Sequence, residues 1–495
     1  MKPRLRFAPS PTGYVHIGGL RTALYNYLYA KQNDGTYLIR IEDTDQTRLV
    51  DGAIEGMVEA MTWAGVPHDE GPFLDEDTHK IYEVGAYGPY IQSNRLEIYK
   101  KHAETLVEKG HAYYCFCSRE RLDEIRETQK SQGLTPKYDG FCRALSKEEV
   151  KAKLQAGVAH VVRLKLPENR EIEFNDAIKG SVVVNTNDMD DQVLMKTDGF
   201  PTYHMAVVVD DHYMGITHVV RGDEWLISTP KHIYTYEAFG WTPPQFVHLP
   251  VILGQTKKKL SKREGDVAVE DFRRRGYLPE ALINYIALVG WSPEDGQEIM
   301  SMQTLIEKFS FDRVSKSSGV FDVDKLNWMN NLYIKNYDLD KLTQLCKPYL
   351  IENGFCDQDV YDDSYDKMKK IVEVLRERLN KLEDLKDYNS FFTKMDVQLE
   401  DDEAKEILMM PHVPELLLNF ADKIMAIEHL NADAVKLVLK EIQKETGHKG
   451  KNLFMPVRVG ITGQVHGPDI AVVIEILGAK LTKERIMYSV NHLCK

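Results

Sequence analysis

The chain is 495 residues long, enough for about three domains of ordinary size, so a single small fold is excluded. Hydrophobic residues make up 43% and charged residues 28%, the proportions of a globular protein and not of a disordered, collagen-like or membrane protein. Lys and Arg number 63 and Asp and Glu 76, and the formal net charge of −13 argues mildly against a nucleic-acid partner, since phosphate binding needs a basic surface.

The first half of the chain alternates short β-rich runs with amphipathic helical patterns, which favours βα units and a mostly parallel sheet. A strand is expected over residues 5–8, then a loop over 9–13 and a helix whose apolar positions recur at helical spacing from Leu20 to Leu28. The next strand is expected over 37–41, and it runs into the acidic segment 42–45.

The sequence pattern of residues 91–200 differs from that of the residues before them, and we interpret them as an α+β insertion. A charged helix is expected over 119–129, and short strands over 161–166 and 181–184. Strand character returns over 203–209 and 217–221. The next helix is expected to begin at Ser228-Thr229-Pro230, with Ser228 as cap and Pro230 in the first turn.

A late strand is expected over 246–253, and beyond Lys257 the pattern is helical nearly to the end of the chain. The predicted fold class is therefore α/β: a doubly wound, Rossmann-type parallel-sheet domain with an α+β insertion, followed by an all-α C-terminal region. No run approaches the roughly 18 apolar residues of a membrane span, and no apolar segment follows the basic residues 1–6. We therefore expect a cytoplasmic protein with no membrane partner.

The loop between the first strand and the first helix reads Pro9-Ser-Pro-Thr-Gly-Tyr-Val-His-Ile-Gly-Gly19. Its prolines stiffen it, His16 stands near the helix N-terminus, and Gly18 and Gly19 remove side chains where backbone must approach a ligand. A first βα turn at a helix N-terminus suits a phosphate group. The alternative is an ordinary turn with a surface histidine.

The segment Lys257-Lys-Lys-Leu-Ser-Lys-Arg263 follows the late strand. Its lysine and arginine side chains are compact, mobile cations that suit a polyphosphate. The negative charge of such a group must be stabilised when it departs in a reaction. Taken alone, a solvated basic loop or a nucleic-acid patch explains it better.

Together these two segments resemble the signature motifs of class I aminoacyl-tRNA synthetases. Within that class, five segments are similar to bacterial glutamyl-tRNA synthetases: residues 6–13, 40–45, 203–204, 220–222 and 319–329. The resemblance covers essentially the whole chain and is weakest in the C-terminal third. It implies ATP-dependent activation of L-glutamate to glutamyl-adenylate, transfer to the 3′-terminal adenosine of glutamate tRNA, Mg²⁺ accompanying the ATP, and a monomer.

The resemblance also implies roles for individual residues. Glutamate is expected to be bound by Arg6, Ser10, Glu42, Tyr203 and Arg221, and the alternative for Glu42 and Arg221 is an ordinary ion pair at strand ends. The expected catalytic residues are His16, Lys259 and Lys262, which act by positioning and electrostatics. The expected ATP-binding residues are Pro9, Ser10, Thr12, Gly13, His16, Gly18, Gly19, Lys259, Leu260, Ser261, Lys262 and Arg263.

Two departures from the family pattern concern the binding sites. Val207 stands where relatives often carry Asn, so no amide contact to the substrate carries over. Many relatives bind zinc through Cys-x-Cys and Cys-x-His. This chain has Cys115, Cys117 and Cys142, but Ala144 in place of the histidine, and Tyr138 matches a residue that could complete a tetrahedral site. Three reduced cysteines without metal are the alternative.

The resemblance divides the chain into five domains: a catalytic domain (1–90 and 201–253), an acceptor-end-binding insertion (91–200), a lysine-loop and tRNA stem-contact domain (254–338), and two helical anticodon-binding domains (339–395 and 396–495). Arg376 and Arg378 fall near the position of an anticodon-reading arginine in the family. A solvated helix face is the alternative for both.

Other functions fit the sequence less well. A dinucleotide-dependent oxidoreductase lacks its Gly-x-Gly-x-x-Gly loop here, and no Walker motif is present. A small-substrate adenylating enzyme does not need the long chain after the lysine loop. A tRNA-binding module without catalysis leaves His16, Glu42 and Lys262 unused. An enzyme that also charges glutamine tRNA stays open.

The distribution of charge permits a tRNA partner despite the acidic total. Residues 51–100 hold 3 basic and 10 acidic side chains, and residues 351–450 hold 14 and 23. The segment 257–275 instead holds 8 basic against 4 acidic side chains. Local basic strips of this kind can face phosphates while acidic surfaces suppress non-specific binding.

Overall fold

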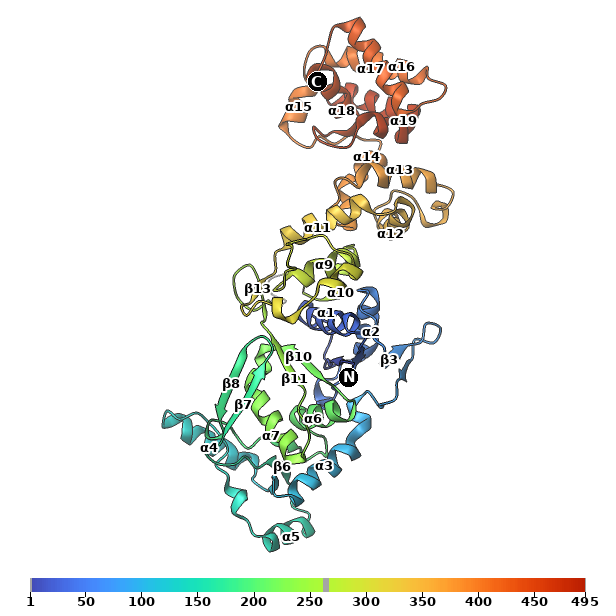
Figure 1. Ribbon diagram of the computed structural model, residues 1–495. Coiled ribbons are helices and arrows are strands. Elements are labelled where there is room, and N and C mark those ends of the chain that lie inside the picture. Colours follow the sequence, from blue (N-terminus) through green and yellow to red (C-terminus); the bar gives the residue numbers. More distant parts are fainter. Residues whose placement is uncertain (1, 261–266, 495) are drawn as a thin grey trace. The chain divides into compact units, whose positions relative to one another are not determined.

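The computed structural model describes residues 2–260 and 267–494, which form two compact units (Figure 1). The first unit comprises Met1–Arg274 with Pro279–Val323, and the second Arg275–Leu278 with Asp324–Lys495. Among the described residues, no helix combines the length and apolar character needed to cross a membrane.

A six-stranded sheet in the order β2-β1-β10-β11-β7-β8 forms the centre of the first unit. Its strands are β1 (Arg4–Phe7), β2 (Thr36–Ile39), β7 (Glu171–Asp176), β8 (Gly180–Asn185), β10 (His218–Gly222) and β11 (Gln245–Leu249). All neighbours are parallel except β7 and β8. Because β2 and β10 flank β1 on opposite sides, the winding reverses there, and ligands bind outside the carboxyl ends of strands at such a point.

Three small sheets complete the β-structure of the described residues in this unit. They pair β3 (Gly71–Leu74) with β4 (Ile81–Val84), join β5 (Ala112–Cys115), β6 (Val161–Leu164) and β9 (Val193–Met195), and pair β12 (Ile252–Leu253) with β13 (Gly319–Val320). The helices are α1 (Ile17–Gln32), α2 (Ala53–Trp63), α3 (Leu96–Glu108), α4 (Arg119–Ser131), α5 (Lys147–Gln155), α6 (Tyr203–Tyr213), α7 (Thr229–Phe239), α8 (Val269–Arg274), α9 (Pro279–Leu288) and α10 (Met302–Lys308).

One hydrophobic core joins the large sheet to the predicted insertion. It includes Leu38 of β2, Leu164 of β6 and Val208 of α6, all with at most 1% of their surface exposed. The strands β7 and β8 lie within the residue range of the insertion, yet they extend the large sheet through the pair Phe246 and Asp176. The insertion therefore contributes structure to the domain it interrupts.

The second unit is helical in its described residues. Its helices are α11 (Val323–Asn336), α12 (Leu339–Glu352), α13 (Tyr365–Leu375), α14 (Asn389–Phe392), α15 (Asp402–Leu408), α16 (Val413–Met425), α17 (Ala432–Thr446), α18 (Lys451–Thr462) and α19 (Ile470–His492). In α16, Leu416, Leu417, Phe420 and Ile424 are buried, the spacing of one helix face. An all-α C-terminal region was the expectation, and it is confirmed.

Two local expectations are wrong. Residues 203–209 form the start of helix α6 and not a strand, because Met205 to Val209 are buried all round and their unbroken apolar run carries no period. The strand expected over 246–253 is broken into β11 and β12 at Pro250, which lacks a backbone N–H for a central strand. The helix start expected at Ser228-Thr229-Pro230 is confirmed, because Ser228 is the N-cap residue of α7 and Pro230 lies in its first turn, although the Ser228 side chain makes no capping hydrogen bond.

Candidate functional site

A cavity of about 1020 Å³ opens at the carboxyl ends of β1 and β10. Among the residues that line it are these predicted from the sequence: Arg6, Ser10, Thr12, His16, Gly18, Gly19, Glu42, Tyr203, Arg221, Lys259 and Leu260. Pro9 and Gly13 belong to the same loop but do not line the cavity. Ser261, Lys262 and Arg263 lie outside the described residues. Val207 is buried in α6 and does not reach the cavity.

His16 caps helix α1 at the edge of this cavity. Its Nδ1 accepts a hydrogen bond from the backbone N–H of Gly18 at 3.0 Å, so a neutral ring carries its proton on Nε2. Among the described residues, a Cβ built on Gly18 would meet only His16 Nδ1, at 3.5 Å, and one on Gly19 would meet Phe7 at 3.5 Å and Val15 at 3.7 Å. Neighbouring protein atoms therefore do not demand glycine here. The absent side chains leave room in the cavity for a ligand.

Lys259 and Leu260 continue from β12 in a hairpin. Leu253 and Lys259 form an antiparallel bridge, and the N–H of Leu260 donates to the carbonyl of Ile252 at 3.1 Å. Leu260 is buried and anchors the hairpin, while Lys259 is exposed. The arrangement brings Lys259 to the cavity that His16 also lines.

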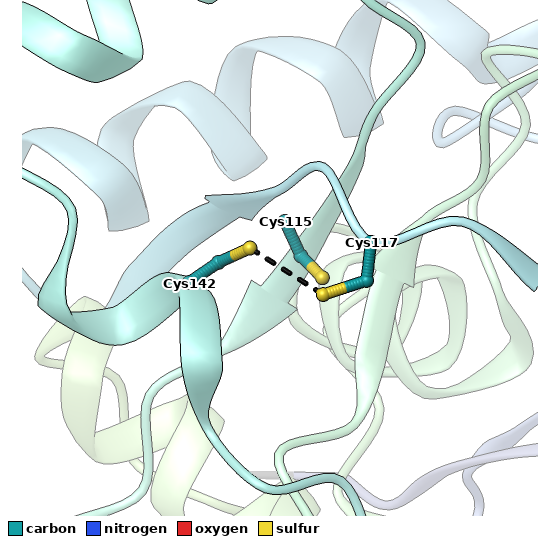
Figure 2. A group of neighbouring side chains, drawn as sticks. All are labelled: Cys115, Cys117 and Cys142. Atoms are coloured by element: carbon teal, nitrogen blue, oxygen red, sulfur yellow. Dashed lines mark hydrogen bonds between the residues drawn. The ribbon is translucent and has the colours of Figure 1, made fainter. Parts of the chain in front are cut away.

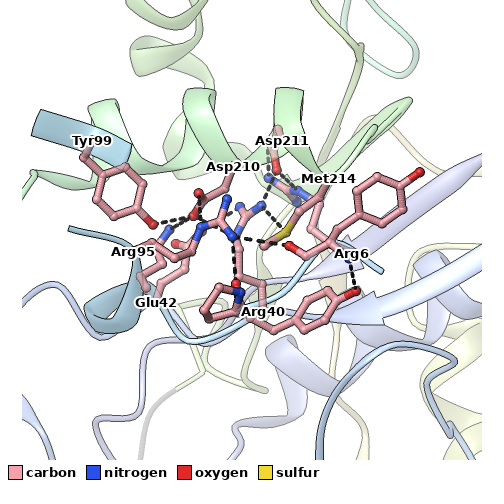
Figure 3. A network of polar contacts seen from close by, with 12 residues as sticks. Arg6, Arg40, Glu42, Arg95, Tyr99, Asp210, Asp211 and Met214 are labelled. Atoms are coloured by element: carbon pink, nitrogen blue, oxygen red, sulfur yellow. Dashed lines mark hydrogen bonds and ion pairs between the residues drawn. The ribbon is translucent and has the colours of Figure 1, made fainter. Parts of the chain in front are cut away.

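Arg6 and Glu42 belong to a buried network of three arginines and three carboxylates (Figure 3). Arg40 donates to Asp211 at 2.7 Å and to Glu42 at 2.9 Å. Arg95 donates to Asp210 at 2.7 Å. The three positive charges are thus matched by three negative charges within the protein. The alternative of an ordinary ion pair therefore holds for the contact of Glu42 with Arg40.

The pKa values of two carboxylates in this network, Glu42 and Asp211, shift in opposite directions. Burial raises the pKa of Glu42 despite the nearby Arg40 and Arg6. Burial also acts on Asp211, but Arg6 and Arg40 outweigh it and lower the pKa of that carboxyl. Glu42 lines the cavity, whereas Asp211 lies behind Arg6. Glu42 is the carboxylate of the pair that a ligand ammonium can reach.

Arg221 lies in a different electrostatic setting. Its N–H groups donate to His248 Nε2 at 3.1 Å, to the hydroxyl of Tyr203 at 2.7 Å and to the hydroxyl of Thr229 at 2.8 Å. A weaker contact joins it to His232 Nδ1 at 3.4 Å. Only 6% of its surface is exposed, and its acceptors among residues 2–260 and 267–494 are all neutral. A buried guanidinium surrounded by neutral acceptors is a site for an anion.

The histidines around Arg221 are held in their neutral form. Burial and the charge of Arg221 lower the pKa of His232 well below its ordinary value. Burial, Lys231 and Arg221 together lower the pKa of His204 to about 4. Burial also lowers the pKa of His248, although Asp176 opposes the change. Neutral imidazoles preserve Arg221 as the local positive charge.

Sequence reasoning missed the residues behind the cavity wall. Asp176 and His248 support Arg221, and Asp210 and Asp211 support the arginine network. A signal for three of them was present, because Asp210 and Asp211 directly follow the apolar run 205–209 and His248 interrupts a buried strand. A charged or titratable residue within such a run needs a partner.

The three cysteines of the insertion point toward one another (Figure 2). Their sulfur atoms all lie within 4.8 Å of one another, and the Cys117 and Cys142 sulfurs are 3.6 Å apart. The hydroxyl oxygen of Tyr138 lies 3.4 Å from the Cys115 sulfur and 3.5 Å from that of Cys117. Zinc with sulfur ligands at about 2.3 Å places tetrahedral neighbours about 3.8 Å apart, so these four atoms fit it.

The two candidate anticodon arginines make contacts with backbone in the second unit. Arg376, at the C-cap of α13, donates to the carbonyl of Lys335. Arg378 donates to the carbonyl of Gly467 at 2.5 Å and is exposed. Of the two, Arg378 is the more exposed residue.

Comparisons with known proteins cover the whole chain. The family model "tRNA synthetases class I (E and Q), catalytic domain" matches residues 2–328, and an anticodon binding domain matches residues 341–490. A glutamate–tRNA ligase of Alkaliphilus metalliredigens is 60% identical over 99% of both chains. One of Clostridioides difficile is 57% identical over 100% of both. The crystal structure of a glutamate tRNA ligase from Elizabethkingia meningosepticum in complex with its amino acid covers 100% of both chains at 37% identity, with a TM-score of 0.88.

Proposed function

We infer that this chain, which belongs to the class I tRNA synthetases (E and Q), is a glutamate–tRNA ligase. It activates L-glutamate with ATP to glutamyl-adenylate and transfers the glutamyl group to the 3′-terminal adenosine of glutamate tRNA. The observation that carries this proposal is Arg221, a buried cation that lines the cavity and whose hydrogen-bond partners, in the part of the chain that the structure describes, are neutral. Such a group suits the side-chain carboxylate of glutamate.

The two ends of glutamate meet complementary charges. Arg221 binds the side-chain carboxylate, and Tyr203, which accepts from Arg221, keeps its own O–H proton to donate to the same group. Glu42 pairs with the ammonium. Arg6 is held against Asp211, so its remaining N–H groups, with Ser10, orient the backbone end of the substrate. The α-carboxylate is then free to attack the α-phosphorus of ATP.

ATP occupies the remainder of the cavity, over the His16 turn. His16 donates from Nε2 to phosphate oxygens, and Gly18 and Gly19 allow the nucleotide to approach the helix N-terminus. Lys259 and Lys262 stabilise the charge that develops on diphosphate as it leaves. Mg²⁺ bound with the ATP is held mainly by phosphate oxygens and spreads their charge. The chemistry is positioning and electrostatic stabilisation.

The rest of the chain supplies tRNA recognition. We propose that residues 91–200 bind the acceptor end, that 254–338 contact the stem, and that the helical domains 339–395 and 396–495 read the anticodon. The match of residues 341–490 to an anticodon binding domain supports the last assignment. The enzyme acts as a monomer. Charging of purified glutamate tRNA and glutamine tRNA, measured side by side, defines its tRNA range.

A substitution at Arg221 tests the glutamate site. Arg221→Ala should raise the KM for glutamate far more than the KM for ATP, because only glutamate loses its ionic partner.

Lys262→Ala should leave folding intact and lower kcat by about 10²- to 10³-fold, the usual effect of removing one transition-state donor. Equal changes in both KM values for Arg221→Ala, or wild-type charging by Lys262→Ala, would contradict these roles.

We also propose that Cys115, Cys117, Cys142 and Tyr138 hold a structural zinc ion. The interatomic distances support this set, and two arginines lie beside it to balance the charge of its anionic ligands: Arg121 donates to the Cys117 sulfur at 3.4 Å, and Arg163 lies 4.1 Å from the centre of the Tyr138 ring. Bound zinc would fix the loop around Tyr138 within the insertion.

Metal analysis of the purified protein tests the zinc proposal directly. We expect about one zinc per chain, lost in Cys117→Ser and weakened in Tyr138→Phe. Cys346→Ser is the matched control, because this buried cysteine lies in the second unit. Metal-free wild-type protein, or equal zinc content in Cys117→Ser, would reject the site.

A further inference from the structure

We propose that Asp176 and His248 are positioning residues for Arg221, and that they set the preference for a carboxylate over a carboxamide at the end of the amino acid side chain. The inference rests on the proposed function, since it takes Arg221 as the group that binds this end of the substrate. Neither residue lines the cavity, so both act through Arg221.

Arg221 determines the direction of the two hydrogen bonds that link Arg221 to His248 and His248 to Asp176. A guanidinium only donates, so His248 Nε2, 3.1 Å from Arg221 Nε, must be an acceptor. The proton of the neutral ring therefore sits on Nδ1 and is donated to Asp176 Oδ2 at 2.6 Å. Both side chains are fully buried. Asp176 thus fixes the tautomer of His248 that Arg221 requires.

The large sheet holds Asp176 itself in place. Its Oδ1 accepts the backbone N–H groups of Ile178 at 3.0 Å and Lys179 at 2.8 Å. Its Oδ2 accepts the backbone N–H of His248 at 3.2 Å. Asp176 ends β7, which lies beside β11, the strand that carries His248. Two neighbouring strands therefore define the position of the guanidinium.

The imidazole between Asp176 and Arg221 also has an electrostatic consequence. Asp211 contacts Arg6 directly and neutralises it, whereas Asp176 reaches Arg221 only through a neutral ring. No carboxylate of the described residues contacts Arg221 directly, so Arg221 is held in place and keeps its positive charge. Such a group gains an ion pair with a carboxylate. A carboxamide brings no charge and turns its N–H donors toward other donors.

The substitution Asp176→Asn tests this chain of hydrogen bonds. The backbone N–H groups of Ile178 and Lys179 will keep the amide oxygen at the place of Oδ1, which turns the NH₂ group toward His248 Nδ1. Nδ1 must then accept, so the proton moves to Nε2 and opposes the N–H of Arg221. The variant replaces one oxygen with nitrogen and leaves the side-chain shape almost unchanged.

The expected result is specific to the amino acid. Asp176→Asn should raise the KM for glutamate about 10- to 100-fold and leave the KM for ATP unchanged, because an unsatisfied buried donor is worth about one to two decades of binding. As the KM for glutamate rises, the preference for glutamate over glutamine should decrease. An unchanged KM for glutamate, or equal increases in both KM values, would overturn the proposal.

His248→Gln provides the matched comparison and keeps the test valid if Asp176→Asn folds poorly. Its amide oxygen can accept from Arg221 whatever stands at position 176, so it should retain much of the glutamate preference. His248→Met has similar bulk without that acceptor and should lose the preference. Equal selectivity in the two variants would overturn the proposal. In the His248→Gln background, adding Asp176→Asn should change the glutamate KM far less than it does alone.

Two measurements separate this inference from the proposed function. Long-range ¹H–¹⁵N spectra of the imidazoles should show His248 protonated on Nδ1 in the wild type and on Nε2 in Asp176→Asn, and Nε2 protonation in the wild type would overturn the inference. A wild-type protein that charges no tRNA with glutamate rejects the proposed function instead. A wild-type enzyme that charges glutamate tRNA, with Asp176→Asn unaltered, rejects only the role of Asp176.

Discussion

Asp211 accepts two hydrogen bonds from Arg6, at 2.9 and 3.2 Å, with both side chains 3% exposed. The same carboxylate accepts from Arg40 at 2.7 Å. A single residue of α6 thus pairs with two arginines, one in β1 and one directly after the neighbouring strand β2. The site consequently has one arginine that the protein neutralises and one, Arg221, that it leaves to the substrate.

Removal of this shared carboxylate should destabilise the first unit strongly. Asp211→Ala leaves Arg6 and Arg40 buried without their common partner, and breaking a buried ion pair typically costs about 3–5 kcal/mol of unfolding free energy. Asp123→Ala, which breaks an exposed pair with Arg126 on α4, is the control and should cost less than about 1 kcal/mol. Denaturant unfolding measures both. Similar losses in the two variants would contradict the account.

The buried His204 makes stability depend on pH. Its pKa is lowered from 6.5 to about 4, so the unfolded chain binds more protons than the folded protein between these values. The unfolding free energy should therefore fall as the pH drops below about 6.5, by up to about 1.4 kcal/mol per pH unit from this group. Above pH 6.5 this contribution vanishes. His204→Gln should flatten the dependence, and equal slopes would show that His204 does not cause it.

His16 has two functions that substitution can separate. His16→Asn keeps a side-chain acceptor at the N-cap of α1 but removes the Nε2 donor, whereas His16→Ala removes both. Both variants should lower kcat by about 10²- to 10³-fold. Only the alanine variant should also lose about 1 kcal/mol of stability. If His16→Asn charged tRNA at the wild-type rate, the phosphate role would be wrong.

Replacement of Gly18 should leave folding intact but should weaken the binding of ATP. A Cβ there lies in ordinary contact, 3.5 Å from His16 Nδ1, and alanine favours a helix over glycine by about 1 kcal/mol. Gly18→Ala should therefore be as stable as the wild type or slightly more so. It should nevertheless raise the KM for ATP, because the methyl group enters the cavity. Thermal unfolding and steady-state kinetics test the two parts, and a stable variant with unchanged KM would exclude close approach of the nucleotide.

The sequence predicted the residues that line the cavity better than the buried residues that hold them in place. The residues of 6–19 and Arg221 follow or end short strands, and the carboxyl ends of parallel strands meet at one edge of a sheet, so their proximity could be inferred. Asp176 and His248 are 72 residues apart, and their contact depends on the register between β7 and β11. No local pattern encodes that register.

The error at residues 203–209 has a related cause. The run Met205-Ala-Val-Val-Val209 is rich in β-branched residues, which favours a strand locally. In the folded protein this run packs against α3, α7 and β9, so every side is apolar and helix satisfies its backbone internally. Tertiary packing thus overrides the local preference, and it places Tyr203 on the first turn of α6 at the cavity.

Glutamate-dependent charging of tRNA tests the central claim most directly. The purified protein, given ATP, Mg²⁺, labelled L-glutamate and glutamate tRNA, should form an alkali-labile glutamyl ester on the tRNA. One AMP and one diphosphate should appear for each ester formed. No ester under these conditions, or release of ADP and phosphate in place of AMP and diphosphate, would contradict the account.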